Sequence, residues 1–150
     1  MDYASSENFL ESLNSYRGMD RKKAFQEICS QLARLNSAYN WVGIYVLENN
    51  KLVLDAFVGE KTEHEQITLG DGLCSLAIVR NEIVNEADVL SNKKYLACFP
   101  ETKSELVVPI RAGKIPVGEI DIDSDTKGAF KREDEKFIQD VADFIGRNFF

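Results

Sequence analysis

The sequence is poor in the residues from which most metal sites and disulfide frameworks are built. It has a single histidine, His64, and three cysteines, none of them in a C-x-x-C pair. Zinc sites use sets of cysteine and histidine, and small secreted domains use even numbers of paired cysteines. We therefore expect no resident metal, no other cofactor and no disulfide scaffold. The cysteines are either inert core residues or redox-active ones.

The sequence also lacks a long apolar run and an excess of positive charge. No apolar stretch approaches the roughly 20 residues of a membrane-spanning helix, and the formal net charge is −7 at pH 7. A negative protein repels the phosphate backbone of nucleic acids and the anionic surface of membranes. Residues 1–6 have neither the basic nor the apolar part of a signal peptide. These absences predict a cytoplasmic protein with no nucleic-acid or membrane partner.

Repeats and proline- or glycine-rich linkers are absent as well, so we expect residues 1–150 to form a single domain. Asp20 can cap a helix that has apolar residues on one face, and a last helix carries a similar stripe. Two hairpins are predicted, 41–47 with 52–58 and 105–110 with 115–122. Helices at both ends of hairpin-linked strands predict an α+β fold, with an antiparallel sheet flanked by N- and C-terminal helices.

Cys74 follows a tight turn that contains Gly70 and Gly72, and a short helix is expected to begin there. Peptide dipoles at the start of a helix stabilise a thiolate, which would lower the pKa of Cys74. The alternative is a small core residue packed under the turn. The local sequence is compatible with both interpretations.

The other two cysteines lie in different surroundings. Cys98 is in a loop that also contains Lys93 and Lys94, and these lysines stabilise a thiolate if they lie close to it. An unreactive Cys98 is equally compatible with the loop sequence. Cys29 follows Ile28 on the second predicted helix, and we expect it to be a core residue.

Three acidic residues alternate with isoleucines along one predicted strand. The two-residue period of a strand places Glu119, Asp121 and Asp123 on the same face. One interpretation is a solvated sheet face. The other is a pocket, in which crowded carboxyl groups raise one another's pKa and one of them stays protonated as an acid. Glu105 begins the neighbouring strand and can reach the same pocket.

Two aromatic residues, Trp41 and Tyr45, share a face of the first predicted strand. They are either ordinary core aromatics or one wall of a pocket for an apolar, sulfur-bearing side chain.

Together these segments resemble the free methionine-R-sulfoxide reductases, a family of GAF domains. The resemblance runs from about residue 40 to residue 149 and includes a turn cysteine, a loop cysteine and two strand motifs in the same order. The matching segments are Asn40-Trp41-Val42-Gly43-Ile44-Tyr45, Phe57-Val58-Gly59, Gly70-Asp71-Gly72-Leu73-Cys74, Ala87-Asp88-Val89, Ala97-Cys98, Ser104-Glu105-Leu106-Val107-Val108-Pro109-Ile110 and Asp121-Ile122-Asp123-Ser124.

The resemblance implies a GAF-like antiparallel sheet of about six strands, an activity and a role for each site residue. The implied reaction reduces free L-methionine-(R)-S-oxide to L-methionine, with thioredoxin as the reductant. Cys98 would be the nucleophile and Cys74 its resolving partner, joined in an intramolecular disulfide after a sulfenic acid. The implied substrate-binding residues are Glu105, Asp121, Asp123, Trp41 and Tyr45. One of Glu105, Asp121 and Asp123 would supply a proton to the sulfoxide oxygen. The sequence leaves open whether the protein forms a homodimer.

The chain departs from the family pattern at several positions. Many members have a third cysteine about ten residues before the turn cysteine, where this chain has Glu63-His64-Glu65. Glu119 replaces a residue that is usually apolar, and Ser75 replaces a usual glycine. The alternative function is a non-catalytic GAF module that binds a small ligand and regulates another protein. Fast-reacting thiols in the native protein would distinguish the enzyme from this module.

Overall fold

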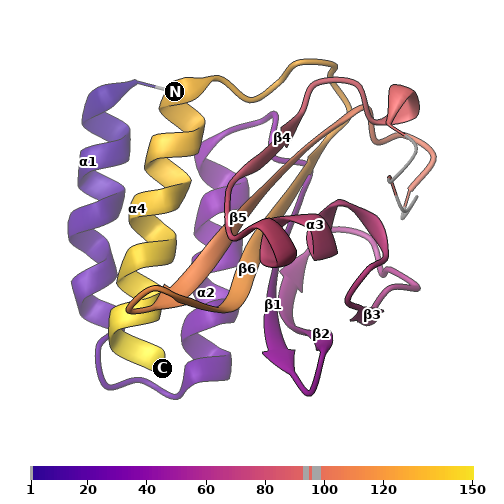
Figure 1. The fold of residues 1–150 in the computed structure, drawn as a ribbon. Helices are drawn as coiled ribbons and strands as arrows, with labels where there is room; N and C mark the ends of the chain where they lie inside the picture. Colours follow the sequence, from indigo (N-terminus) through magenta and orange to yellow (C-terminus); the bar gives the residue numbers. More distant parts are fainter. Residues whose placement is uncertain (1, 93–94, 96–98) are drawn as a thin grey trace.

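The computed structural model of the chain describes residues 2–92, 95 and 99–150 (Figure 1). Lys93, Lys94 and Cys98 lie outside the described residues, so the predictions for these three positions stay predictions.

The centre of the described structure is a six-stranded sheet with the strand order β3-β2-β1-β6-β5-β4. Every pair of neighbouring strands is antiparallel. The strands are β1 (Trp41–Glu48), β2 (Lys51–Val58), β3 (Gln66–Thr68), β4 (Val84–Glu86), β5 (Ser104–Ala112) and β6 (Ile115–Ser124). Both predicted hairpins are confirmed, as β1–β2 and β5–β6. The first turns at Asn49 and Asn50, which both adopt positive φ as a tight hairpin turn requires.

Helices cover both faces of this sheet (Figure 1). One face carries α1 (Tyr3–Ser12), α2 (Arg21–Leu35) and α4 (Arg132–Phe149), and the other carries α3 (Gly72–Arg80). Two short 3-10 helices, η1 (Leu13–Tyr16) and η2 (Val89–Ser91), complete the described elements. The prediction of an α+β fold with terminal helices flanking an antiparallel sheet is confirmed.

The larger core lies between the sheet and the terminal helices. The side chain of Asp20 accepts a hydrogen bond from the backbone N–H of Lys23 and so starts α2, as predicted. The apolar stripe of α2 then buries Phe25, Ile28 and Leu32 completely against the sheet. Each such side chain contributes about 1.5–3 kcal/mol to stability through burial.

Cys29 belongs to this larger core, on the face of the sheet that α2 covers. It is completely buried, and its Sγ lies 3.9 Å from the backbone oxygen of Ala56. Burial, reinforced by the negative charge of Asp55, raises the pKa of the Cys29 thiol well above its usual range. The prediction that Cys29 is a core residue is confirmed.

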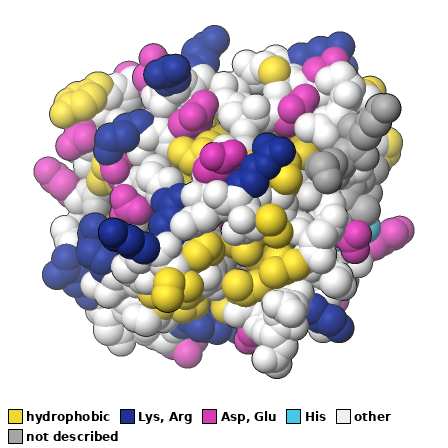
Figure 2. Space-filling model, in the orientation of Figure 1, with side chains coloured by type: hydrophobic (Ala, Val, Ile, Leu, Met, Phe, Trp, Pro, Cys, Tyr) yellow, Lys and Arg dark blue, Asp and Glu magenta, His cyan; other side chains and the backbone are white. Residues whose placement is uncertain are grey.

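Hydrophobic side chains gather on the face of the molecule where α3 and the β5–β6 hairpin lie (Figure 2). Val79 on α3 and Ile115 at the start of β6 are both largely exposed. Within the described part of the chain, no helix combines the length and the apolar character that crossing a membrane demands.

Candidate active site

The candidate site lies under α3, on the face of the sheet opposite the terminal helices. A second, smaller core forms there and includes Trp41, Tyr45, Cys74, Phe99 and Val107. The side chains that face it come from alternate residues of β1, β6 and β5, as the two-residue period of a strand dictates.

Strand register lines up the acidic residues of this face. Asp123 of β6 pairs with Glu105 of β5 on one side and with Trp41 of β1 on the other. Two residues further along β6, Asp121 pairs with Val107 and with Gly43. The structure therefore places three acids side by side, and we call Glu105, Asp121 and Asp123 the acid row.

The acid row is buried rather than solvated. The exposed fractions are 5% for Glu105, 2% for Asp121 and 3% for Asp123. The interpretation of this strand face as a solvated one is therefore wrong, because α3 and the smaller core cover it. The expectation that Glu105 reaches the acids of β6 is confirmed.

Burial and mutual repulsion shift the acid row toward its protonated form. Burial raises the pKa of Glu105 well above its usual range, and the negative charges of Asp121 and Asp123 raise it further. Burial likewise raises the pKa of Asp123, with the charge of Asp121 adding to the effect. Burial also raises the pKa of Asp121, although hydrogen bonds with Glu105 and Cys74 oppose that rise. Crowded buried carboxyl groups of this kind cannot all ionise, so the row holds at least one neutral acid.

Cys74 lies against the acid row, in the first turn of α3. Its Sγ is 3.4 Å from Oδ2 of Asp121 and 3.9 Å from Oε2 of Glu105. Burial raises the pKa of the Cys74 thiol well above its usual range, and the charges of Asp121, Glu119 and Glu105 raise it further. The predicted lowering of this pKa by the helix dipole is therefore wrong. Burial and the three neighbouring acids favour the neutral thiol of Cys74.

The turn before Cys74 is fixed by its own backbone. Gly70 and Gly72 both adopt positive φ, which a residue with a side chain rarely tolerates. The backbone N–H of Gly70 donates a hydrogen bond to Oγ of Ser75. Ser75, one of the departures from the family pattern, thus helps to close the turn that points Cys74 at the acids.

Trp41 lies flat over β1 because Gly43 leaves room for it. A Cβ atom on Gly43 would come within 2.3 Å of the Trp41 ring. The ring stacks on Phe57 at 5.9 Å between centroids and contacts Phe99 at 6.0 Å. Its Nε1 donates a hydrogen bond to the backbone oxygen of Glu60. Three aromatic rings therefore form one wall beside the acid row.

A cavity of about 250 Å³ opens at this wall. It is lined by Asn40, Trp41, Glu60, Phe99, Glu101, Thr102, Asp123 and Asp125. The cavity thus joins the aromatic wall to one end of the acid row. Its acidic lining suits a ligand that carries a positive charge.

Tyr45 has a different position from Trp41. It is completely buried in the smaller core, and its hydroxyl donates a hydrogen bond of 2.7 Å to the backbone oxygen of His64. The segment of Glu63, His64 and Glu65 thus supports Tyr45 through its backbone. Of the two predicted aromatics, Trp41 lines the cavity and Tyr45 lies in the core behind it.

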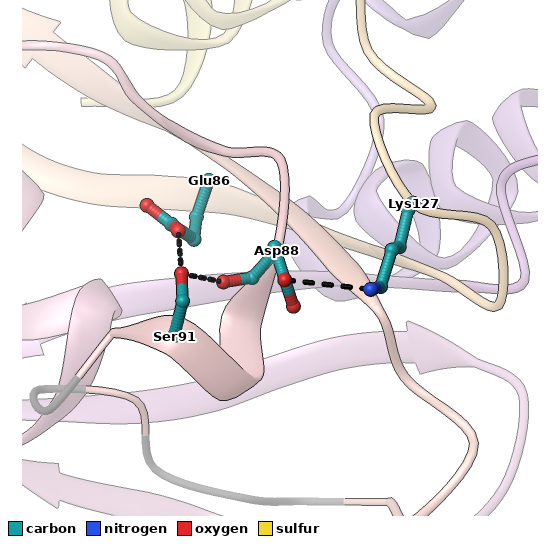
Figure 3. Close-up of polar contacts among 4 residues, drawn as sticks. All are labelled: Glu86, Asp88, Ser91 and Lys127. Carbon is teal, nitrogen blue, oxygen red and sulfur yellow. Dashed lines mark hydrogen bonds and ion pairs between the residues drawn. The ribbon is translucent and has the colours of Figure 1, made fainter.

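A polar network anchors the segment that leads from β4 towards Cys98 (Figure 3). The hydroxyl of Ser91 donates hydrogen bonds to Oε1 of Glu86, at 3.5 Å, and to the backbone oxygen of Asp88, at 2.8 Å. Lys127 Nζ lies 3.5 Å from Oδ2 of Asp88. These contacts hold η2 against the sheet at the edge where Glu86 pairs with Glu105. Cys98 itself lies outside the described residues.

Glu119 shares the buried face of β6 with Asp121 and Asp123, as the two-residue period of the strand indicated. It is completely buried, and its carboxyl group interacts with the thiol of Cys74. Burial raises the pKa of Glu119 well above its usual range, and the charge of Asp121 adds to the effect. Phe57 and Phe99 escaped prediction, because their contacts with Trp41 depend on the tertiary structure. For Phe57, its place on the strand facing Gly43 is the signal that was available.

The arrangement combines a thiol, neutral carboxylic acids and an aromatic wall in a covered site. A neutral acid can donate a proton to a ligand oxygen, and an ionised one can hold a ligand ammonium group. Cys74, Glu105 and Asp121 also offer three ligand atoms within 4.8 Å of one another, a spacing that suits a small cation.

Comparisons with known proteins agree with this architecture. The model of the GAF domain family matches residues 20–149. A type II free methionine-R-sulfoxide reductase from Thermoplasma acidophilum has a similar structure, with a TM-score of 0.82 and 57% sequence identity. That alignment covers 85% of this chain and 93% of the other.

Two curated relatives carry the name free methionine-R-sulfoxide reductase. The one from Escherichia coli is 36% identical over 68% of this chain, and the one from Saccharomyces cerevisiae is 38% identical over 73%. The matched segments cover 61% and 62% of these relatives, so the chain spans about three-fifths of their length. The family match and the high identity to the Thermoplasma protein confirm the resemblance seen in the sequence. The chain belongs to the GAF domain family and, within it, to the free methionine-R-sulfoxide reductases.

Proposed function

We propose that the protein reduces free methionine-R-sulfoxide to methionine, with cysteine thiols as the source of electrons. The observation that carries the proposal is the buried acid row beside Cys74, in a chain 57% identical to a reductase with this activity in its name. The acids meet a chemical need of the reaction. A sulfoxide is a poor electrophile until its oxygen is protonated or hydrogen-bonded.

The substrate would bind with its apolar thioether part against the aromatic wall and its ammonium group against the ionised members of the acid row. The cavity beside Trp41 and Asp123 provides both surfaces. A buried carboxylate pays a large desolvation cost, which a bound ammonium group offsets. This requirement favours a free amino acid over a methionine sulfoxide whose nitrogen is part of a peptide bond.

In the chemical step, the Cys98 thiolate attacks the sulfoxide sulfur while a neutral acid of the row protonates the oxygen. The oxygen passes to the Cys98 sulfur, so the S–O bond of the sulfoxide breaks and a new S–O bond forms. Methionine leaves reduced by two electrons, and Cys98 is oxidised to a sulfenic acid. The raised pKa of Glu105 and Asp123 favours these two as proton donors. The nucleophilic role of Cys98 derives from the family resemblance.

In the second step, Cys74 condenses with the Cys98 sulfenic acid, so that a disulfide forms and water leaves. A neutral Cys74 thiol must lose its proton as it attacks, and Asp121, whose Oδ2 lies 3.4 Å from Sγ, can accept it. A thioredoxin dithiol then reduces the disulfide and restores both thiols. Cys29 takes no part, because it is buried in the larger core on the opposite face of the sheet.

The rival function, a GAF module that only binds a ligand, requires neither the thiols nor a disulfide. Peptide mapping after a single turnover with methionine-R-sulfoxide distinguishes the two functions. We expect a disulfide between Cys74 and Cys98, with Cys29 still reduced. Three free thiols after exposure to substrate would contradict the proposed reaction, and a disulfide that contains Cys29 would contradict the assignment of Cys74.

A further inference from the structure

The carboxyl groups around Cys74 lack partners that buried polar groups normally have. Within the described part of the chain, Oδ1 of Asp121 and Oδ1 of Asp123 are buried and form no hydrogen bond. A buried polar group left without a partner costs about 1–3 kcal/mol. Both residues are more than nine-tenths buried. These unpaired oxygens therefore point to a positively charged ligand that the polypeptide alone does not supply.

The spacing of the ligand atoms fits one class of cation. In a tetrahedral zinc site, with Zn–S near 2.3 Å and Zn–O near 2.1 Å, sulfur and oxygen ligands lie about 3.6 Å apart. The Sγ of Cys74 lies 3.4 Å from Asp121 Oδ2 and 3.9 Å from Glu105 Oε2, which brackets that spacing. Hard cations such as Mg²⁺ prefer oxygen ligands, so the thiol selects a thiophilic ion.

We propose that the reduced protein binds one thiophilic divalent cation, of the zinc and cobalt class, through Cys74, Glu105 and Asp121. Binding replaces the thiol proton and the carboxyl protons by the metal, so protons are released. Glu119 contributes negative charge beside Cys74. The ion is a competitor of the substrate and not a resident cofactor, because it occupies the acids and the thiol that the reaction uses.

Competition with the substrate rests on the proposed function, whereas binding of the ion does not. A zinc-loaded protein should be unable to hold a substrate ammonium group on the acid row or to form a disulfide through Cys74. Zinc should therefore inhibit turnover reversibly, and a chelator should restore it.

Cobalt(II) titration of the reduced protein in the absence of oxygen and substrate tests the site. Wild type should bind one cobalt ion and develop a near-ultraviolet sulfur-to-cobalt charge-transfer band. Cys74→Ser should lose the band. Asp121→Asn should weaken binding by at least about tenfold, since even changes outside the first ligand shell have that effect. Cys29→Ser, which removes a buried thiol remote from the acids, should bind as wild type does.

Circular dichroism checks that each variant is folded. If Cys74→Ser does not fold, the near-isosteric Asp121→Asn variant and the wild-type stoichiometry still decide the matter. A wild type without a saturable band would overturn the proposal, as would a folded Cys74→Ser variant that keeps the band. Because no substrate is present, an inactive protein still tests the cation site, and an active protein without cobalt binding refutes only that site.

Discussion

Glu119 should make the protein less stable as the pH rises, and Glu119→Gln should remove part of that dependence. The ordinary pKa of a glutamate is 4.5, and burial holds the pKa of folded Glu119 well above it. Above pH 4.5 the unfolded chain loses this proton while the folded chain keeps it. The folded state then binds more protons, so the free energy of unfolding falls as the pH rises.

The expected size of the effect follows from proton linkage. One proton held only by the folded state changes the free energy of unfolding by about 1.4 kcal/mol per pH unit. Glutamine has nearly the same shape and does not titrate. Between about pH 5 and pH 7, the stability of Glu119→Gln should fall less steeply than that of wild type, by up to about 1.4 kcal/mol per unit.

Urea unfolding of the reduced protein at several pH values, with a chelator present, measures this difference directly. Glu48→Gln is the matched control, because Glu48 is an exposed glutamate on the same sheet. It should follow the wild-type slope. Parallel pH dependences for wild type and Glu119→Gln would refute the reasoning, because they would mean that folded Glu119 ionises as readily as the unfolded one. Turnover of Glu119→Gln should change only mildly.

Three further predictions concern the site. Changing any one member of the acid row to its amide should lower turnover by about a hundredfold or more, the scale of acid catalysis, and near wild-type rates for all three would contradict the proposed roles. Cys74→Ser should lose thioredoxin-supported turnover but keep some activity with dithiothreitol, whereas Cys29→Ser should keep both; equal loss in the two variants would contradict the assignment. Gly43→Ala should lower the free energy of unfolding by about 1–3 kcal/mol and raise the KM for substrate, because the added Cβ displaces the Trp41 ring. Thermal unfolding and steady-state kinetics measure the two effects, and an unchanged stability and KM would contradict this role of Gly43.

Most of the architecture follows from patterns within single segments. The helical stripe of α2 and the alternation along β6 each reveal which side of an element is apolar, and the two hairpins complete the α+β prediction. The strand β3 (Gln66–Thr68) could not be predicted, since three residues are too few to show a period of two. Its pairing with β2 is visible only in the folded chain.

The sequence predicts which acids share a strand face, but it does not predict whether that face is covered. Alternation places Asp121 and Asp123 on one face, yet a solvated face and a covered pocket give the same polar pattern. Only the packing of α3 onto β5 and β6 shows that the acids are buried. The predicted direction of the pKa shift of Cys74 was wrong for a related reason. A helix dipole can be inferred from the local sequence, whereas acids 31 and 47 residues away cannot.

The most direct test of the central claim is a thioredoxin-coupled assay of the purified protein with four substrates: the free R-epimer of methionine sulfoxide, the free S-epimer, the N-acetylated R-epimer and a peptide-bound sulfoxide. The proposed reaction predicts rapid consumption of the free R-epimer and little of the other three, because the acid row must hold a free ammonium group. No consumption of the free R-epimer with thioredoxin or dithiothreitol would contradict the reductase function itself. Equal turnover of the free and the N-acetylated R-epimer would contradict recognition of the ammonium group by Glu105, Asp121 and Asp123.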